Sequence, residues 1–453
     1  MDTLTAARAA FAVSLAFHIV FAALGVGLPV LLCIAEGLGL RRRDATWYAL
    51  ARRWGKAAGI LFVVGAVSGT TLSFELGLLW PRFMAIASSV IGLPFAIEGF
   101  TFFLEAIFIG IYLYGWDRLS PLVHWLTTLP LVVSGALGTW MVVTANAWMN
   151  APAGFRLVNG HAVDVDPLAA MRNLATPAEQ IHMTLAAIQV ASFGVATLYA
   201  VALLRGQRGA YYRRGLLLPL LVGSIAAPLQ AIAGDRSAVM VADTQPVKLA
   251  AMEGLFQTTI GAPLRILGFP DVATGQTRFA IEIPKLLSLL AYHDPNAKVQ
   301  GLDAFPRSDW PSYVPMVHWA FDTMVGLGTL MIVVPAIFWF LYLRRGHAIP
   351  ENRWLLRALA LLGPFAIIAL ECGWIVTEGG RQPWVINHVM LVRDGATTAP
   401  GVGIFFYLFL AIYLFLTVVL IGLLLRLARQ LPQVAEEQVK AATASDSDSD
   451  EEA

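Results

Sequence analysis

Residues 355–384 read LLRALALLGPFAIIALECGWIVTEGGRQPW, an apolar run that ends in a carboxylate and an arginine. As far as Glu378 the run is long enough to cross a bilayer, which takes about 20 predominantly apolar residues in a helix. An ionisable side chain where a membrane helix meets its loop is costly without a partner, so Glu378 indicates a functional site. We expect Glu378 to face a metal cofactor. The simpler alternative is an ion pair with Arg381, three residues on.

The composition is typical of a polytopic membrane protein. Of the 453 residues, 58% are hydrophobic and 13% are charged, whereas soluble domains carry about 25% charged residues. The net charge of +1 favours no particular partner, and we expect no binding to nucleic acid. Cys33 and Cys372 lie in apolar runs and predict neither a disulfide framework nor a thiolate metal site. We expect no removable signal peptide at the N-terminus.

Nine apolar runs predict an all-α membrane helix bundle with about nine transmembrane helices. The sixth run is the least regular, because Pro219 and Pro228 interrupt it. The runs cover residues 11–40, 55–79, 94–115, 123–147, 182–204, 216–233, 315–343, 355–378 and 403–427.

The loops predict the orientation of this bundle. Each odd-numbered run is followed by arginine, as at residues 41–43 after the first run and at Arg205 and Arg208 after the fifth. The positive-inside rule then places the N-terminus outside and the C-terminus in the cytoplasm. The chain divides into transmembrane helices 1–6 (1–233), an extracytoplasmic loop (234–314), transmembrane helices 7–9 (315–430) and a disordered cytoplasmic tail (431–453).

Four side chains that can bind heme iron fall toward the predicted outer side, each on a different run. Imidazole, thioether and carboxylate groups all serve as axial ligands, and a His/Met pair is typical of a low-spin, electron-transferring heme. Convergence of such residues from four helices is more than isolated polar residues would produce by chance. The candidate metal ligands are His18, His182, Met324 and Glu378.

Each of these candidates also has a structural explanation. His18 could be a core histidine bonded to a carbonyl group, and His182 could be an interfacial residue at a helix start. Methionine often fills gaps in apolar cores, so Met324 alone favours packing. His318 lies close to Met324 in the sequence and is its most serious rival as a ligand.

Two further groups could carry protons. Glu98 and Glu105 are seven residues apart, close to two helical turns, so they share one helix face and suit a proton relay in a membrane. The alternative is that each pairs with a neighbouring helix. In the long loop, Lys248 and Glu253 could bond to the oxygens of a quinol and accept its proton. Without other evidence, they are an ordinary charged pair on a short amphipathic helix.

Taken together, these stretches resemble subunit I of the cytochrome bd-type quinol oxidases over nearly the whole chain. The short outer loop and the amino-acid sequence around Met324 are similar to those of the short-loop, cyanide-insensitive branch of that family. The stretches that carry the resemblance are residues 374–384, 94–105, 115–118, 145–149, 234–253 and 324–328.

The resemblance implies three hemes near the outer face. His182 and Met324 would hold a low-spin heme b, while His18 and Glu378 would serve a high-spin heme b and either heme d or a second high-spin heme b. The remaining positions follow from the same resemblance. Trp374, Arg381 and Gln382 would contact cofactors, Lys248, Glu253 and Asp235 would serve quinol in the loop, and Glu98 and Glu105 would serve proton supply.

The implied activity is oxidation of quinol at the outer face and reduction of oxygen to water, which builds a proton gradient without pumping. The implied setting is the bacterial inner membrane, with a subunit II, a small single-helix subunit and ubiquinol or menaquinol as partners. Two other functions remain open. A proton-coupled transporter would share the topology and the carboxylates but would be colourless. A heme-b electron-transfer subunit would oxidise quinol without reacting with oxygen.

Overall fold

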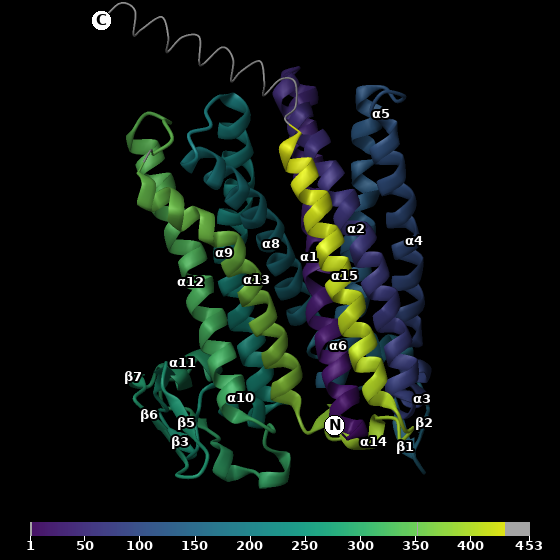
Figure 1. Ribbon diagram of the computed structural model, residues 1–453. Helices are drawn as coiled ribbons and strands as arrows, with labels where there is room; N and C mark the ends of the chain where they lie inside the picture. The colour runs from purple at the N-terminus through teal and green to yellow at the C-terminus, as the bar shows by residue number, and fades with distance from the viewer. Residues whose placement is uncertain (1, 351, 431–453) are drawn as a thin grey trace, which may run out of the picture.

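The computed structural model describes residues 2–350 and 352–430, and within them nine helices are long and apolar enough to cross a membrane (Figure 1). The predicted all-α membrane bundle is confirmed. The tail at 431–453 lies outside the described residues. The spanning helices are α1 (Thr3–Arg42), α2 (Ala45–Leu79), α4 (Gly92–Gly115), α5 and α6 (Pro121–Leu126 and Thr128–Asn150, together one span), α8 (Thr176–Leu204), α9 (Ala210–Thr244), α12 (Val314–Arg344), α13 (Arg353–Arg381) and α15 (Val402–Arg429).

Short elements join the spans. The helical ones are α3 (Pro81–Val90), α7 (Pro167–Met171), α10 (Pro246–Met252), α11 (Leu286–Tyr292), α14 (Val392–Gly395) and the 3-10 turns η1 (Leu302–Ala304) and η2 (Arg307–Asp309). The antiparallel strand pairs are β1 (Arg156–Val158) with β2 (His161–Val163), β3 (Thr259–Ile260) with β8 (Lys298–Val299), β4 (Leu264–Ile266) with β7 (Ile281–Ile283), β5 (Phe269–Asp271) with β6 (Gln276–Arg278), and β9 (Trp384–Ile386) with β10 (Met390–Leu391).

The sixth span corrects the predicted boundary at residue 233. Helix α9 is continuous through Pro219 and Pro228 and ends at Thr244, so Asp235, which we placed in the loop, belongs to this helix. Prolines are tolerated inside membrane helices because neighbouring helices and local adjustments satisfy the freed backbone groups. The helix also continues past the end of its apolar run, and hydropathy alone does not reveal such an extension.

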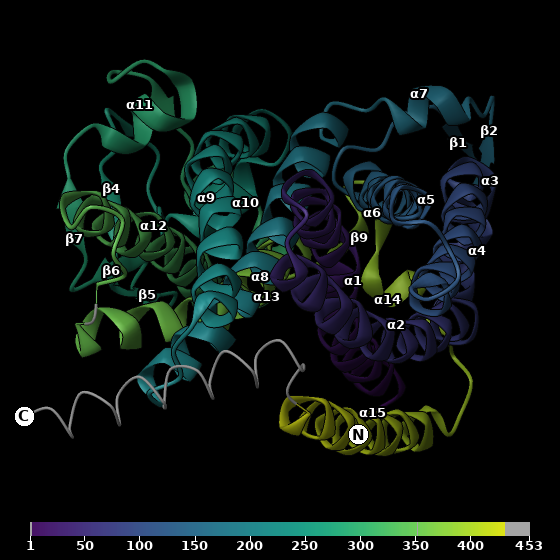
Figure 2. The same ribbon diagram turned by 90° about the horizontal axis from the view of Figure 1, so that it is seen from above.

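Helix α8 lies at the centre of the bundle. It packs against α9, α13 and α1, and these helices share the main apolar core, whereas α4 lies at one side with α6 and α12 lies at the other (Figure 2). Small residues let the backbones approach, as is usual in membrane bundles. A Cβ atom at Gly27 of α1 would lie 2.5 Å from the carbonyl oxygen of Ala187 on α8, so this crossing requires glycine.

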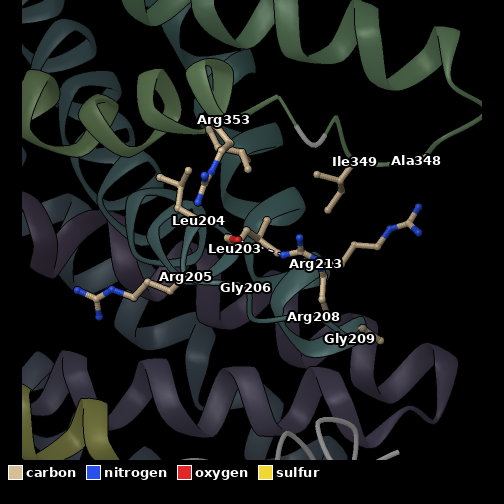
Figure 3. Close-up of a pocket in the computed structure, with 12 residues that line it drawn as sticks. Leu203, Leu204, Arg205, Gly206, Arg208, Gly209, Arg213, Ala348, Ile349 and Arg353 are labelled. Atoms are coloured by element: carbon tan, nitrogen blue, oxygen red, sulfur yellow. Dashed lines mark hydrogen bonds between the residues drawn. The ribbon is translucent and has the colours of Figure 1, made fainter. Parts of the chain in front are cut away.

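The two ends of the bundle differ, and we name them by what they carry. The loop end carries the N-terminus of α1 and residues 245–313, where the expected short helices are joined by three short strand pairs (Figure 1). The arginine end carries the turns after α1, α8 and α12. There a cavity of about 890 Å³ lies between the α8–α9 turn and the segment before α13, lined by Arg205, Arg208, Arg213 and Arg353 (Figure 3).

Candidate functional site

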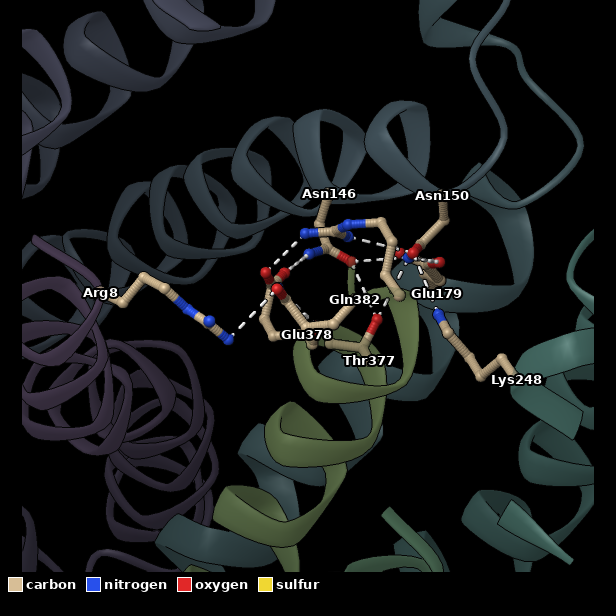
Figure 4. Close-up of polar contacts among 9 residues, drawn as sticks. Arg8, Asn146, Asn150, Glu179, Lys248, Thr377, Glu378 and Gln382 are labelled. Atoms are coloured by element: carbon tan, nitrogen blue, oxygen red, sulfur yellow. Dashed lines mark hydrogen bonds and ion pairs between the residues drawn. The ribbon is translucent and has the colours of Figure 1, made fainter. Parts of the chain in front are cut away.

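Polar side chains from five helices meet at the loop end in one network (Figure 4). Glu378 and Arg381 come from the last turn of α13, which ends at Arg381 where the apolar run gives way to Gln382 and Pro383. The network residues are Arg8 of α1, Asn146 and Asn150 of α6, Glu179 of α8, Lys248 of α10, and Thr377, Glu378, Arg381 and the adjoining Gln382 at the end of α13.

Glu378 has a donor on each carboxylate oxygen. Asn146 Nδ2 lies 2.5 Å from Oε1, and Arg381 Nη2 lies 2.5 Å from Oε2, while 28% of the Glu378 side chain stays exposed. The ion pair with Arg381 that we considered as an alternative is therefore present. The ion pair leaves acceptor sites free on the carboxylate, because two ionised oxygens offer about four lone-pair sites.

Asn150 connects the Glu378 group to the loop helix α10. Its Oδ1 accepts from Arg381 Nη1 at 3.0 Å and from Lys248 Nζ at 3.1 Å, and its Nδ2 lies 2.8 Å from Glu179 Oε1. Asn150 thus bonds to two cations and one carboxylate, and the second carboxylate, Glu378, is joined to it through Arg381. This balance of charge is what a low-dielectric site requires, since an unpaired buried charge is strongly destabilising.

Asn146, Asn150 and Glu179 were not among the predicted site residues. The signal was available for the two asparagines, because they lie four residues apart at the end of an apolar run and therefore share a helix face. Glu179 gave no comparable signal, because a glutamate in the first turn of a helix is ordinary.

Lys248 is placed by a close approach between α10 and α13. A Cβ atom at Gly380 would lie 2.8 Å from Cγ of Lys248, so the lysine stem runs over this glycine. The side chain is 3% exposed. Burial, reinforced by the positive charge of Arg381, lowers the pKa of Lys248 to about 7, so the amine is easily neutralised where it lies.

Glu253 lies apart from Lys248 and is not its partner. The two residues are five apart along the chain, which points them to different faces, and Glu253 lies near Asp322 and Arg265 instead. Burial and then the negative charge of Asp322 raise the pKa of Glu253 to about 8. A carboxyl group with such a pKa can accept or release a proton near neutral pH.

His318 anchors the loop rather than competing with Met324. Its Nδ1 lies 2.7 Å from the carbonyl oxygen of Met252, and its Nε2 lies 3.2 Å from that of Leu267. Asp322, one turn further along α12, accepts from the backbone nitrogen of Leu267 at 2.6 Å. Both ring nitrogens of His318 therefore face loop carbonyl groups, and neither is directed at a metal position.

His182 and Met324 have surroundings that fit an iron porphyrin. His182 Nδ1 is buried and has no hydrogen-bond partner among the described residues, so the ring is not held as a structural histidine. A Cβ atom at Gly234 of α9 would lie 3.6 Å from Cε1 of His182, and one at Gly373 of α13 would lie 3.3 Å from Sδ of Met324. Glycines of neighbouring helices thus lie directly beside both candidate ligands, where a larger residue would crowd them.

His18 has an arrangement that prepares one ring nitrogen for a metal. Its Nδ1 lies 3.0 Å from Oγ of Ser68 on α2, and Ser68 itself donates to the carbonyl oxygen of Val64. Ser68 therefore accepts from His18, which leaves the lone pair on Nε2. A metal-binding histidine characteristically donates its other ring nitrogen in this way.

The remaining predicted residues are distributed around these positions. Glu98 and Glu105 are half-buried on α4, and Glu105 Oε1 would lie 3.3 Å from a Cβ atom at Gly25 of α1, so the side chain reaches that helix. Trp374 packs against the main core, and Asp235 is half-buried on α9. Gln382 Oε1 accepts from Arg8 at 3.3 Å, at the edge of the network.

The described residues contain no group of three or more His, Cys, Asp or Glu side chains arranged for a metal ion. A heme iron needs only one or two protein ligands, so the separate positions of His18, His182, Met324 and Glu378 are compatible with heme and not with a bare metal cluster. All four lie in the loop-end halves of their helices.

Comparisons with known proteins extend over almost the whole chain. Residues 6–432 match the family model described as cytochrome bd terminal oxidase subunit I. The putative cytochrome bd menaquinol oxidase subunit I of Bacillus subtilis is 39% identical over 95% of this chain and 98% of its own length. The cytochrome bd ubiquinol oxidase subunit 1 of the same organism is 30% identical over 94% and 93%. The solved bd oxidase from Geobacillus thermodenitrificans matches with a TM-score of 0.90 and 37% identity, covering 95% of this chain and 99% of that one.

Proposed function

Because the chain belongs to the family of cytochrome bd terminal oxidase subunit I, we propose that it is the heme-bearing subunit of a quinol oxidase in the bacterial inner membrane. The observation that supports this most strongly is the buried network that joins Lys248 of the loop to Glu378. Glycines lie beside the candidate ligands His182 and Met324 on neighbouring helices. A transporter would need neither a buried His182 Nδ1 without a hydrogen-bond partner among the described residues nor the glycine beside Met324.

The residues divide into two heme groups. His182 and Met324 would hold the low-spin heme b between α8, α9, α12 and α13. His18 and Glu378 would serve the two high-spin hemes, a heme b and either heme d or a second heme b, with Trp374, Arg381 and Gln382 beside them. When bound, the hemes supply one-electron transfer and the reduction of oxygen to water.

Quinol would be oxidised at the loop end. Lys248 can donate to a quinol oxygen while Asn150 holds its amine, and Glu253 can accept a released proton because its pKa is close to neutral pH. Asp235 of α9 lies on the helix that leads into this loop. With arginines concentrated in the turns of the other end, the loop end would face outward, so the protons of quinol leave outside.

Protons for water would come from the cytoplasmic side. Glu98 and Glu105 on α4 are the carboxylates we assign to this proton path. The side chain of Glu105 reaches α1, so the path would extend to that helix. Release of quinol protons on one face and uptake on the other separates charge without a pump. The expected partners are subunit II, a small single-helix subunit, membrane ubiquinol or menaquinol, and oxygen.

One preparation tests the proposal. The purified complex should absorb in the Soret region, and it should consume oxygen when quinol is added. A colourless protein would rule out the heme function and favour the transporter. A heme spectrum without oxygen uptake would instead favour an electron-transfer subunit that passes quinol electrons to another protein.

A further inference from the structure

A buried carboxyl group lies outside every assignment made above. Glu75 of α2 is 0% exposed, and the hydroxyl of Ser14 on α1, also 0% exposed, donates to its Oε1. Oε2 of Glu75 is buried and has no hydrogen-bond partner among the described residues. Tyr413 of α15 lies on the third side of this group, with its buried hydroxyl beside Ser14, Thr71 and Glu75.

The surroundings of Glu75 indicate that it carries a proton. Helix α1 contributes Ser14 and, one turn deeper, His18, while α15 contributes Tyr413. No arginine or lysine among residues 2–350 and 352–430 forms an ion pair or hydrogen bond with Glu75. An isolated carboxylate in an apolar interior is far more costly than the neutral acid, so the group takes the neutral form.

Glu75 is aligned with the expected heme ligand on α1. Ser14 and His18 are four residues apart on α1, and Ser68 and Glu75 are seven apart on α2, so each pair shares a helix face. Since α1 and α2 are antiparallel neighbours, Ser14 meets Glu75 and His18 meets Ser68 at two successive levels. On α1 the side chains of Ser14 and His18 are roughly 6 Å apart. On α2, Ser68 and Glu75 are about 10 Å apart along the helix.

We propose that Glu75, Ser14 and Tyr413 form a proton-holding site that serves the heme position of His18. This inference rests on the proposed function, in which each oxygen molecule takes four electrons and four protons to become two waters. Once the Ser14 hydroxyl turns to accept from the acid, Glu75 would give it one proton, and Ser14 would pass its own proton to the oxygen being reduced at the heme that His18 would hold, while His18 itself takes up no proton. The carboxylate that remains is stabilised by the Ser14 and Tyr413 hydroxyls until one proton taken up from the cytoplasmic side restores the acid.

The site is separate from the Glu98 and Glu105 path. Those carboxylates lie on α4, whereas Glu75, Ser14 and Tyr413 lie on α2, α1 and α15. Its position toward the loop end places it on the other side of His18 from the arginine end, where the α4 path begins.

Replacing Glu75 by glutamine tests the proposal, because glutamine keeps the size of the side chain and removes the acid. In the purified complex we expect Glu75→Gln to lower oxygen consumption at saturating quinol by about tenfold or more. Heme content and the KM for quinol should stay unchanged. The redox-induced infrared difference spectrum should also lose one C=O band of a protonated carboxyl group, and Glu75→Asp should restore part of both signals.

The matched control is Tyr407→Phe, a substitution on the exposed face of the same helix as Tyr413, where the side chain is 67% exposed. It should change neither turnover nor the infrared band. Wild-type turnover together with an intact carboxyl band in Glu75→Gln would overturn the proposal.

Two further variants keep the inference testable if Glu75→Gln fails to assemble. Ser14→Ala and Tyr413→Phe leave the acid in place and remove its hydroxyl neighbours, so each should shift the carboxyl band and slow turnover. An unchanged band in both would equally overturn the proposal. A wild-type complex without heme absorbance would instead refute the proposed function, and the role assigned to Glu75 would fall with it.

Discussion

The loop end and the arginine end both carry many charges, but the charges named here are exposed at the arginine end and buried at the loop end. At the arginine end the Arg52–Asp117 pair is 47% and 77% exposed, and the arginines around the cavity of Figure 3 lie at the surface. At the loop end Lys248 and Arg381 are each 3% exposed. Solvated arginines cost little and orient the chain, whereas buried cations require partners. The buried charges therefore mark the functional end.

One buried pair at the arginine end sharpens this contrast. His124 Nδ1 lies 2.6 Å from Glu36 Oε1, and His124 Nε2 lies 2.9 Å from the carbonyl oxygen of Tyr112. Both ring nitrogens are thus occupied, and the pair ties α1 to α4 and α5. His182 at the loop end is also buried, yet its Nδ1 has no partner among the described residues. A histidine with both ring nitrogens hydrogen-bonded is typical of a structural role, and a histidine with an unbonded ring nitrogen is typical of a metal ligand.

The largest effect should follow from removing the imidazole of His182. His182→Ala should abolish the low-spin heme signal in the reduced-minus-oxidised spectrum, because no other described side chain replaces an axial imidazole at this position. His161→Ala, on the exposed strand β2, is the matched control and should leave the spectrum unchanged. An unaltered low-spin signal in His182→Ala would remove this ligand assignment.

A second test concerns the loop carboxyl group. Glu253→Gln should lower quinol oxidation by about 100-fold with heme content intact, because the proton acceptor is lost. The carboxylate must be unprotonated to accept a proton, and its pKa is about 8, so the wild-type rate should rise between pH 7 and pH 9. That rise should be absent in Glu253→Gln. Full turnover in the variant would exclude the loop site.

The pH dependence can itself be shifted. Asp322 is the negative neighbour that helps to raise the pKa of Glu253, so Asp322→Asn should lower that pKa. The rise in rate should then occur at lower pH than in the wild type. The asparagine oxygen can still accept from the backbone nitrogen of Leu267, so the loop should remain in place. A pH profile identical to that of the wild type would contradict this pairing.

A moderate effect should follow from crowding Lys248. Gly380→Ala would place a Cβ atom 2.8 Å from the lysine Cγ, so the side chain must move away from Asn150, and we expect quinol turnover to fall by about tenfold. Gly422→Ala, in the arginine-end half of α15 where a Cβ atom meets nothing within 4 Å, is the control and should behave as wild type. Equal behaviour of the two variants would show that the lysine position is not critical.

The smallest effect should be at the arginine end. Arg205→Gln removes one exposed charge from the cavity of Figure 3, and several arginines remain in the same turns. We expect thermal stability to change by no more than about 0.5 kcal/mol and quinol turnover to stay at the wild-type level. A large loss of turnover would mean that this end also takes part in the reaction.

The sequence predicted the spans well and the polar contacts poorly. Nine apolar runs corresponded to nine spanning helices within the described residues, although α9 continued to Thr244 and brought Asp235 into the helix. Lys248 and Glu253 were treated as one pair, but the structure separates them. Asn150 and Glu179 had no assigned role and proved to be the partners that connect Lys248 to α6, α8 and α13.

By itself, the sequence determined the number and approximate limits of the membrane helices and the residue types able to bind iron. Hydrophobic length and side-chain chemistry are local properties, so they can be read without knowing the neighbours. Only the tertiary structure decided which buried charges meet, since Asn150 lies 98 residues from Lys248 and 231 from Arg381. It also left Glu75 enclosed by three helices. Such contacts depend on how helices pack, which a run of apolar residues leaves open.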